Sequence, residues 1–148
     1  MRNAPLVAAI VLVWALTLDL ASKAWVVAHE DVLIVVYNGR DGRLGSRIAM
    51  SLVAFAVTAA LSRLARWRGY PEIWGMWIGS GLLVAGVLGN GVSRLLWSRG
   101  VPDFLLIGRD AWNLADFAIG VGLTGGIVSL LGTALFAYAR GRIQVARP

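Results

Sequence analysis

Four long runs of apolar residues, separated by polar stretches that contain glycine or proline, dominate the hydrophobic pattern of the chain. A helix needs roughly 20 mostly apolar residues to cross a bilayer, and each run is close to that length or longer. The pattern therefore predicts a single membrane domain, 1–148, with spanning helices over about residues 4–28, 48–66, 73–97 and 113–139. We expect the first run to remain a helix and not a cleaved signal peptide, because it lacks a clear small-residue cleavage site.

A short β-element is expected between the first two helices. The polar stretch there contains a β-branched apolar insert, Val32 to Tyr37, followed by the glycine-rich sequence NGRDGRLG (38–45). This pattern predicts a strand and a turn. Within the third and fourth helices, Gly75 and Gly79, and Gly122 and Gly126, have the GxxxG spacing that lets membrane helices approach closely. The predicted fold class is an all-α membrane protein with four transmembrane helices and a small extracytoplasmic β-element.

The composition is typical of a membrane protein, and it argues against nucleic-acid binding and against a metal site. The chain is 58% hydrophobic and only 15% charged, with a mean hydropathy of +0.72. Its net charge of +6 comes from basic residues at segment ends and in loops, so we expect contact with lipid head groups and not with nucleic acid. Cysteine is absent, and His29 with its acidic neighbours does not make a convincing metal site. No metal or cofactor is expected.

Two pairs of polar residues lie where lipid-facing residues would be apolar. Asp19 and Lys23 are four residues apart and share a helix face, as do Asn90 and Arg94. Charges in spanning segments are costly and usually face the protein interior. Asp19 and Lys23 could form a structural ion pair, Lys23 could extend to the interface, or both could shape an active site. Arg94 could brace a carboxylate or a loop carbonyl, or could anchor the helix at the interface.

Asp103 and Asp116 flank a short loop at one membrane edge. Asn113 is a plausible N-cap of the fourth helix and Asp116 its N3 residue, so Asp116 could simply complement the helix dipole. Asp103, in the apolar turn VPDF, could be an ordinary loop acid. Together, however, two close carboxyls would share a proton. The ionised carboxyl could then activate water while the protonated one hydrogen-bonds to a peptide carbonyl. We therefore interpret the pair as an aspartyl protease dyad.

Five short motifs, in order along the chain, resemble those of the lipoprotein signal peptidases (signal peptidase II), a family of bacterial membrane aspartyl proteases. They are LDLASK (Leu18 to Lys23), VYN (Val36 to Asn38), GNGVSR (Gly89 to Arg94), VPDF (Val101 to Phe104) and NLAD (Asn113 to Asp116). The resemblance implies cleavage of prolipoproteins before a diacylglyceryl-modified cysteine. It implies that Asp103 and Asp116 are catalytic and that the other polar residues of these motifs support them or the substrate: Asn38, Asn90, Arg94, Asn113, Asp19 and Lys23.

Three departures from the family pattern bear on activity. Ser93 stands where the family has an aspartate, and Arg40 stands where it has a glycine. The loop between Asp103 and Asp116 is also short for the family. These differences leave open a catalytically impaired relative that binds signal peptides or lipoproteins without cleavage. A small transporter using buried charges as an ion relay is a third possibility, but the polar groups cluster at one face and do not cross the bilayer.

Basic residues favour one orientation. Once Lys23 and Arg94 are set aside as intramembrane groups, the side of the termini carries the larger share of Lys and Arg. Cytoplasmic loops are enriched in these residues. We therefore expect a multi-pass protein of the bacterial inner (cytoplasmic) membrane, with both termini cytoplasmic and the active site near the outer face. The expected partners are the prolipoprotein signal peptide with its diacylglyceryl cysteine, and membrane lipids.

Overall fold

The computed structural model describes residues 3–39, 44–70 and 72–145, and within them the side chains of all residues except 44, 47 and 141–145. Its long helices are α1 (Ala4–Ala28), α2 (Leu44–Trp67), α3 (Trp74–Leu96) and α4 (Leu114–Val145). Each contains a segment long and apolar enough to cross a membrane. The predicted fold class, four spanning helices with a small β-element, is confirmed. Helix α2 begins four residues earlier than expected, and α4 continues beyond Tyr138.

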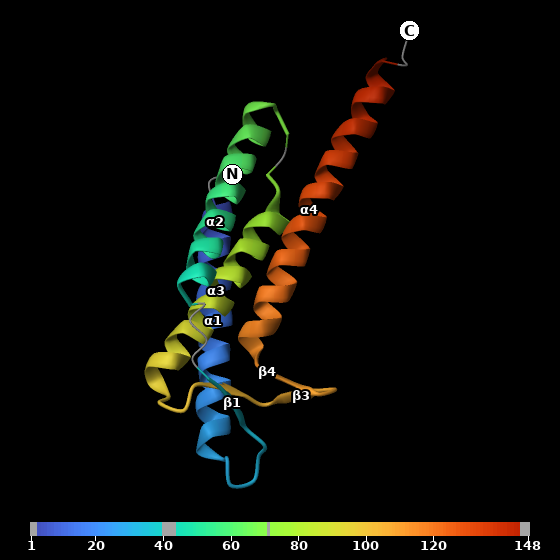
Figure 1. Ribbon diagram of the computed structural model, residues 1–148. Coiled ribbons are helices and arrows are strands. Elements are labelled where there is room, and N and C mark those ends of the chain that lie inside the picture. The colour runs from blue at the N-terminus through green and yellow to red at the C-terminus, as the bar shows by residue number, and fades with distance from the viewer. Residues whose placement is uncertain (1–2, 40–43, 71, 146–148) are drawn as a thin grey trace.

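Helix α3 is the centre of the bundle, because it packs against α1, α2 and α4. Figure 1 shows α4 close to α3 at the end where the strands lie and diverging from it toward the opposite end. The apolar side chains on the outer faces of α1, α2 and α4 are largely exposed, as expected for surfaces that contact lipid. By contrast, α3 buries much of its length, and many of its buried residues are glycine, alanine or serine. Small residues allow this central position.

Glycine contacts explain the closeness of α3 and α4. A Cβ on Gly79 would lie 2.5 Å from the Gly122 carbonyl oxygen, and a Cβ on Gly122 would lie 2.6 Å from the Gly79 carbonyl oxygen. A Cβ on Gly75 would overlap the Ser129 side chain. The close approach predicted from the GxxxG spacing is therefore present at Gly75, Gly79 and Gly122. A Cβ on Gly126 would meet no atom within 4 Å, so Gly126 contributes its backbone alone.

The described residues form two antiparallel strand pairs, both at one end of the bundle (Figure 1). Strand β1 (Val36–Asn38) pairs with β2 (Val101–Asp103), with Asn38 opposite Val101 and Val36 opposite Asp103. Strand β3 (Leu105–Ile107) forms a hairpin with β4 (Asp110–Trp112). The two-residue hairpin turn has Gly108 first, with φ +64°, a conformation that glycine adopts without steric cost.

Two local predictions at this end were wrong. The strand expected at Val32 to Tyr37 is shifted to Val36–Asn38, because Val32 and Leu33 donate to the His29 carbonyl in a turn that follows α1. Asp103, expected in a turn, is the last residue of β2. A strand as short as this forms only where another strand pairs with it. Here β1 and β2, which pair with each other, are far apart in the sequence. The predicted turn after Asn38 lies largely outside the described residues, as does Arg40.

Candidate active site

Asp103 is buried at the end of β2, with only 1% of its surface exposed. The side-chain amides of Asn38, on β1, and Asn113, just before α4, each donate a hydrogen bond to one of its carboxylate oxygens. Burial raises the pKa of Asp103 above its ordinary value, and the nearby charge of Asp116 adds to that rise. The hydrogen bonds from Asn113 and Asn38 and the charge of Lys23 act in the opposite direction without cancelling the rise.

Asp116 lies in the first turn of α4 and is bound to the residue that caps it. The Asn113 backbone N–H donates to Asp116 Oδ2 at 3.1 Å, and the Asp116 backbone N–H donates to Asn113 Oδ1 at 3.2 Å. This reciprocal pair is a capping box, which satisfies backbone donors that a helix start leaves free. The capping role considered for Asp116 is therefore real. It coexists with a link to Asp103, because Asn113 binds the Asp116 carboxyl through its backbone N–H and the Asp103 carboxyl through its side-chain amide.

Asn90, on α3, connects the two sides of the site. Its Nδ2 donates to Asp116 Oδ1 at 3.0 Å. Its Oδ1 accepts hydrogen bonds from Lys23 Nζ at 2.9 Å and from Asn113 Nδ2 at 3.1 Å. A buried amide with both ends engaged has one orientation, since reversing it would place donor against donor. Asn90 is thereby fixed with its N–H toward Asp116.

Asp19 and Lys23 form a buried ion pair within α1, with Lys23 Nζ 2.8 Å from Asp19 Oδ2. Lys23 has no exposed surface, so it does not extend to the interface. Asp19 Oδ1 accepts a hydrogen bond from the Ala115 backbone N–H at 2.8 Å. A carboxylate from one helix thus caps the start of another, where the helix dipole favours negative charge. The pair is structural, and through Asn90 it is also part of the carboxyl site.

Two glycines on α3 make this arrangement possible, and the sequence did not single them out for it. A Cβ on Gly86 would lie 2.3 Å from the Ala115 carbonyl oxygen, and a Cβ on Gly89 would lie 2.4 Å from Asp19 Oδ2. The first turn of α4 can therefore rest on α3 while the Asp19 side chain passes beside Gly89. Gly86 and Gly89 lie close to Asn90 in the sequence, which is a signal that α3 is closely packed there. A contact among three helices, however, has no local sequence pattern.

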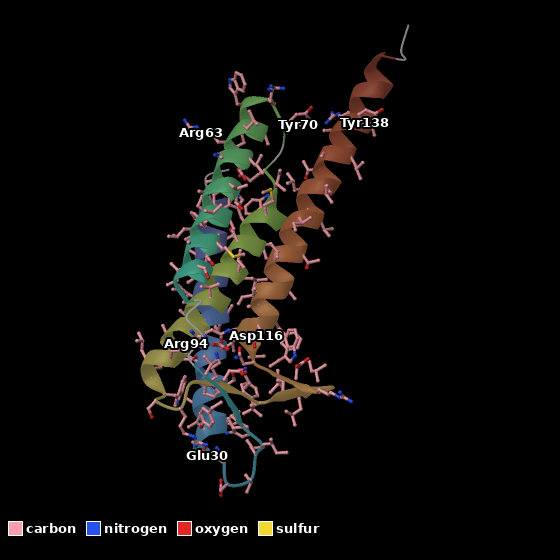
Figure 2. All side chains as sticks on the ribbon, viewed as in Figure 1. Glu30, Arg63, Tyr70, Arg94, Asp116 and Tyr138 are labelled. Carbon is pink, nitrogen blue, oxygen red and sulfur yellow. The ribbon has the colours of Figure 1, made fainter. Side chains whose placement is uncertain are left out.

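Ser93 and Arg94 follow Asn90 at the end of α3. Ser93 is fully buried, and its hydroxyl donates to the Gly89 carbonyl at 2.5 Å within the same helix. The residue that departs from the family pattern therefore packs inside the bundle. Arg94 is half-buried, and Figure 2 shows it at the same end of the bundle as Asp116.

Hydrogen bonds connect the following predicted site residues: Asn38, Asp103, Asn113, Asp116, Asn90, Lys23 and Asp19. Arg94 lies at the same end (Figure 2). No cluster of three or more His, Cys, Asp or Glu side chains suited to a metal ion occurs within the described residues. The site offers two carboxyls at different depths of burial, held by amides that donate to them.

The fold and this site define a multi-pass membrane protein with a pair of interacting carboxyls at one end of a four-helix bundle. Residues 10–132, most of the chain, match the family Signal peptidase (SPase) II. The chain therefore belongs to the signal peptidase II family, which confirms the resemblance seen in the five motifs.

Individual relatives agree with this assignment. A lipoprotein signal peptidase of Synechocystis sp. is 28% identical over 103 residues, which cover 68% of this chain and 55% of the relative. The match thus spans about half the length of that relative. A solved structure described as a bacterial membrane enzyme, at 2.3 Å resolution, aligns with a TM-score of 0.60 and 18% identity over 86% of this chain and 88% of its own. A second, at 1.9 Å resolution, aligns with a TM-score of 0.52 over 84% and 92%. At this identity the structures show a shared fold.

Proposed function

We propose that this protein is a membrane aspartyl endopeptidase that removes the signal peptide from diacylglyceryl-modified prolipoproteins, cutting before the lipidated cysteine. The observation that carries the proposal is the link between the two carboxyls: the Asn113 side chain donates to Asp103 while its backbone binds Asp116. Membership of the signal peptidase II family supports the substrate class. Because the site is at one end of four spanning helices, it suits a bond that lies at a membrane edge.

The proposed reaction uses a shared proton. One carboxyl of the Asp103–Asp116 pair is ionised and takes a proton from a water molecule, whose oxygen attacks the scissile carbonyl carbon. The protonated carboxyl hydrogen-bonds to the carbonyl oxygen and gives it a proton as the tetrahedral intermediate forms. The intermediate collapses when the C–N bond breaks and a carboxyl returns a proton to the departing amine of cysteine. Because the carboxyls interact, their pKa values belong to the pair.

The other polar residues have supporting roles in this proposal. Asn38, Asn90 and Asn113 hold the carboxyls by donating to them, and Asp19 with Lys23 anchors Asn90 and the start of α4. Arg94 lies at the same end of the bundle, where we propose that it supports the site or the substrate (Figure 2). We place the chain in the bacterial cytoplasmic membrane with both termini cytoplasmic and this end at the outer face, as its basic residues favour.

The test is cleavage of a synthetic diacylglyceryl prolipoprotein by the purified protein in detergent, followed as a gel shift. Changing Asp103→Asn or Asp116→Asn should lower the rate by at least about 10²-fold, since each removes a proton-transferring group. Asp110→Asn is the matched control, because Asp110 is an exposed carboxylate of the same loop region and should leave the rate unchanged. Unaltered processing by either dyad variant would overturn the proposal.

The alternative is a relative that binds signal peptides or lipoproteins without cutting them. The serine at position 93 motivates it. Against it, the Ser93 hydroxyl bonds within α3 and both carboxyls keep their amide donors. The alternative predicts that the wild type captures the lipidated substrate and releases no product, even at enzyme concentrations above that of the substrate. The same gel-shift assay with a pull-down of uncleaved substrate separates the two functions.

A further inference from the structure

Three side chains form a cluster on the strand end of the molecule that the proposed reaction does not use. Arg99 Nη1 donates to both carboxylate oxygens of Glu30, at 2.9 and 2.8 Å, and the Tyr37 hydroxyl donates to Glu30 Oε2 at 2.8 Å. The Arg99 guanidinium also lies over the Tyr37 ring, 3.9 Å from its centroid. We call these three residues the clasp. They connect the turn after α1, strand β1 and the turn that precedes β2.

Strand β1 needs such a support. It has three residues and, within the described part of the chain, pairs only with the three residues of β2; an isolated two-stranded pair is marginally stable in water. A slip of one residue in such a pair turns every side chain to the opposite face. Asn38, the last residue of β1, donates to Asp103, so a slip would remove that hydrogen bond from the carboxyl.

The clasp is placed to prevent this slip. Side chains alternate along a strand, so Tyr37 and Asn38 point to opposite faces. Asn38 faces Asp103, whereas Tyr37 meets Arg99 and Glu30 on the other side. Gly100, which follows Arg99 in the sequence, has φ +117°, and a Cβ on it would lie 2.2 Å from the Asn38 carbonyl oxygen. Arg99 therefore contacts the Tyr37 side chain, while the missing side chain of Gly100 lets the chain pass close to the Asn38 backbone.

We propose that Arg99, together with Glu30 and Tyr37, is a positioning group that keeps β1 in the register in which Asn38 donates to Asp103. This inference rests on the proposed function of Asp103 for its effect on catalysis, but not for its effect on β1. Each clasp member acts through Asn38 and does not touch the reacting atoms.

The clasp has a consequence for the pH dependence of the site. The Asn38 amide favours the ionised form of Asp103, so its loss raises the pKa of that carboxyl. The charges that act on Asp103 come from the packed helices: Lys23 on α1 and Asp116 on α4. Neither of these two residues belongs to the clasp. The limb of the pH–rate profile that reports Asp103 should therefore move to higher pH, whether Asp103 serves as the base or the acid.

The first experiment does not depend on cleavage. Hydrogen exchange of a peptide covering residues 36–38 is compared in the wild type, Arg99→Gln and the control Arg109→Gln, whose arginine lies exposed in the β3–β4 turn. Exposed ion pairs and cation–π contacts are individually weak, so Arg99→Gln should speed this exchange by about three- to tenfold. Arg109→Gln should leave it unchanged. Unaltered exchange in Arg99→Gln would overturn the proposal even if the protein cleaves nothing.

The second experiment separates positioning from general support of the fold. Asn38→Ala and Arg99→Gln should each move the Asp103 limb upward, by up to roughly one pH unit. The double variant should move it no further than Asn38→Ala alone, because Arg99 acts through Asn38. Additive shifts, or a shift in Arg109→Gln, would overturn the proposal. Faster exchange in Arg99→Gln with no cleavage by the wild type would refute the proposed function and leave the clasp standing.

Discussion

Asn113 and Asp116 hydrogen-bond to each other twice across the first turn of α4, backbone N–H to side-chain oxygen in both directions. The same Asn113 side chain donates to Asp103 and to Asn90. A helix cap therefore sets the relation between the two carboxyls. The spacing that makes Asp116 look like an ordinary capping residue is the spacing that holds it beside Asp103.

Changing Asn113 separates the cap from the carboxyl link. Asn113→Ala should lower the free energy of unfolding by about 1 kcal/mol through loss of the cap. It should also lower cleavage by about 10²-fold, since Asp103 loses a donor and the helical turn that carries Asp116 loses its cap. Asn113→Ser keeps a capping oxygen but has no amide to donate to Asp103. It should keep most of the stability and lose most of the activity. Full cleavage by Asn113→Ser would contradict the role given to the side-chain amide.

The buried Asp19–Lys23 pair should show strong coupling. Lys23→Met leaves the Asp19 carboxylate buried without its cation and should destabilise the protein by about 3–5 kcal/mol. The double variant Asp19→Asn with Lys23→Met removes both charges and should recover a large part of that loss. Unfolding in detergent, arranged as a double-mutant cycle, measures the coupling. Additive losses would show that the two charges do not depend on each other.

Ser93 should be dispensable for cleavage. Its hydroxyl donates to a carbonyl one turn earlier in its own helix, a bond whose net contribution is about 1 kcal/mol or less. Ser93→Ala should therefore cleave the substrate at a rate within a few-fold of the wild type. A collapse of activity in a folded Ser93→Ala protein, checked by its thermal unfolding, would mean that the serine takes part in the reaction.

Within the GxxxG motifs of α3 and α4, replacing Gly79 by alanine should destabilise the protein, whereas replacing Gly126 by alanine should not. Gly79→Ala places a methyl group against the Gly122 carbonyl and should cost about 1–3 kcal/mol. Gly126→Ala is the matched control, since its methyl group meets no atom within 4 Å. Thermal unfolding of both variants in the same detergent compares them. Equal destabilisation would indicate that helix propensity or lipid contact governs the effect.

Asp103 should make stability depend on pH in a defined direction. Burial, aided by the charge of Asp116, raises its pKa above the ordinary value of 3.8, so the folded protein holds this proton to higher pH than the unfolded chain. The stabilisation from this proton is complete below pH 3.8 and is lost as pH rises through the raised pKa. Across that window the melting temperature of the wild type should fall relative to Asp103→Asn, which cannot titrate. A parallel pH dependence of the two proteins would contradict the raised pKa.

The sequence determined the four spanning helices, because the length and hydrophobicity of each apolar run are local properties, and the thickness of the bilayer sets the values they need. It also identified Asn113 and Asp116 as a capping pair and marked Asp19, Lys23 and Asn90 as polar residues in need of partners. Those signals come from spacing along one helix, where i, i+3 and i, i+4 neighbours always meet.

Only the tertiary structure determined which groups Asp19, Lys23 and Asn90 bind. Asp19 reaches the backbone of Ala115 because Gly86 and Gly89 let α4 rest on α3, and no local pattern encodes a contact among three helices. The one predicted strand was misplaced for the same reason: β1 exists at Val36–Asn38 only because β2 lies opposite it. The clasp joins residues from three separate segments, so its formation depends on the folded arrangement of all three.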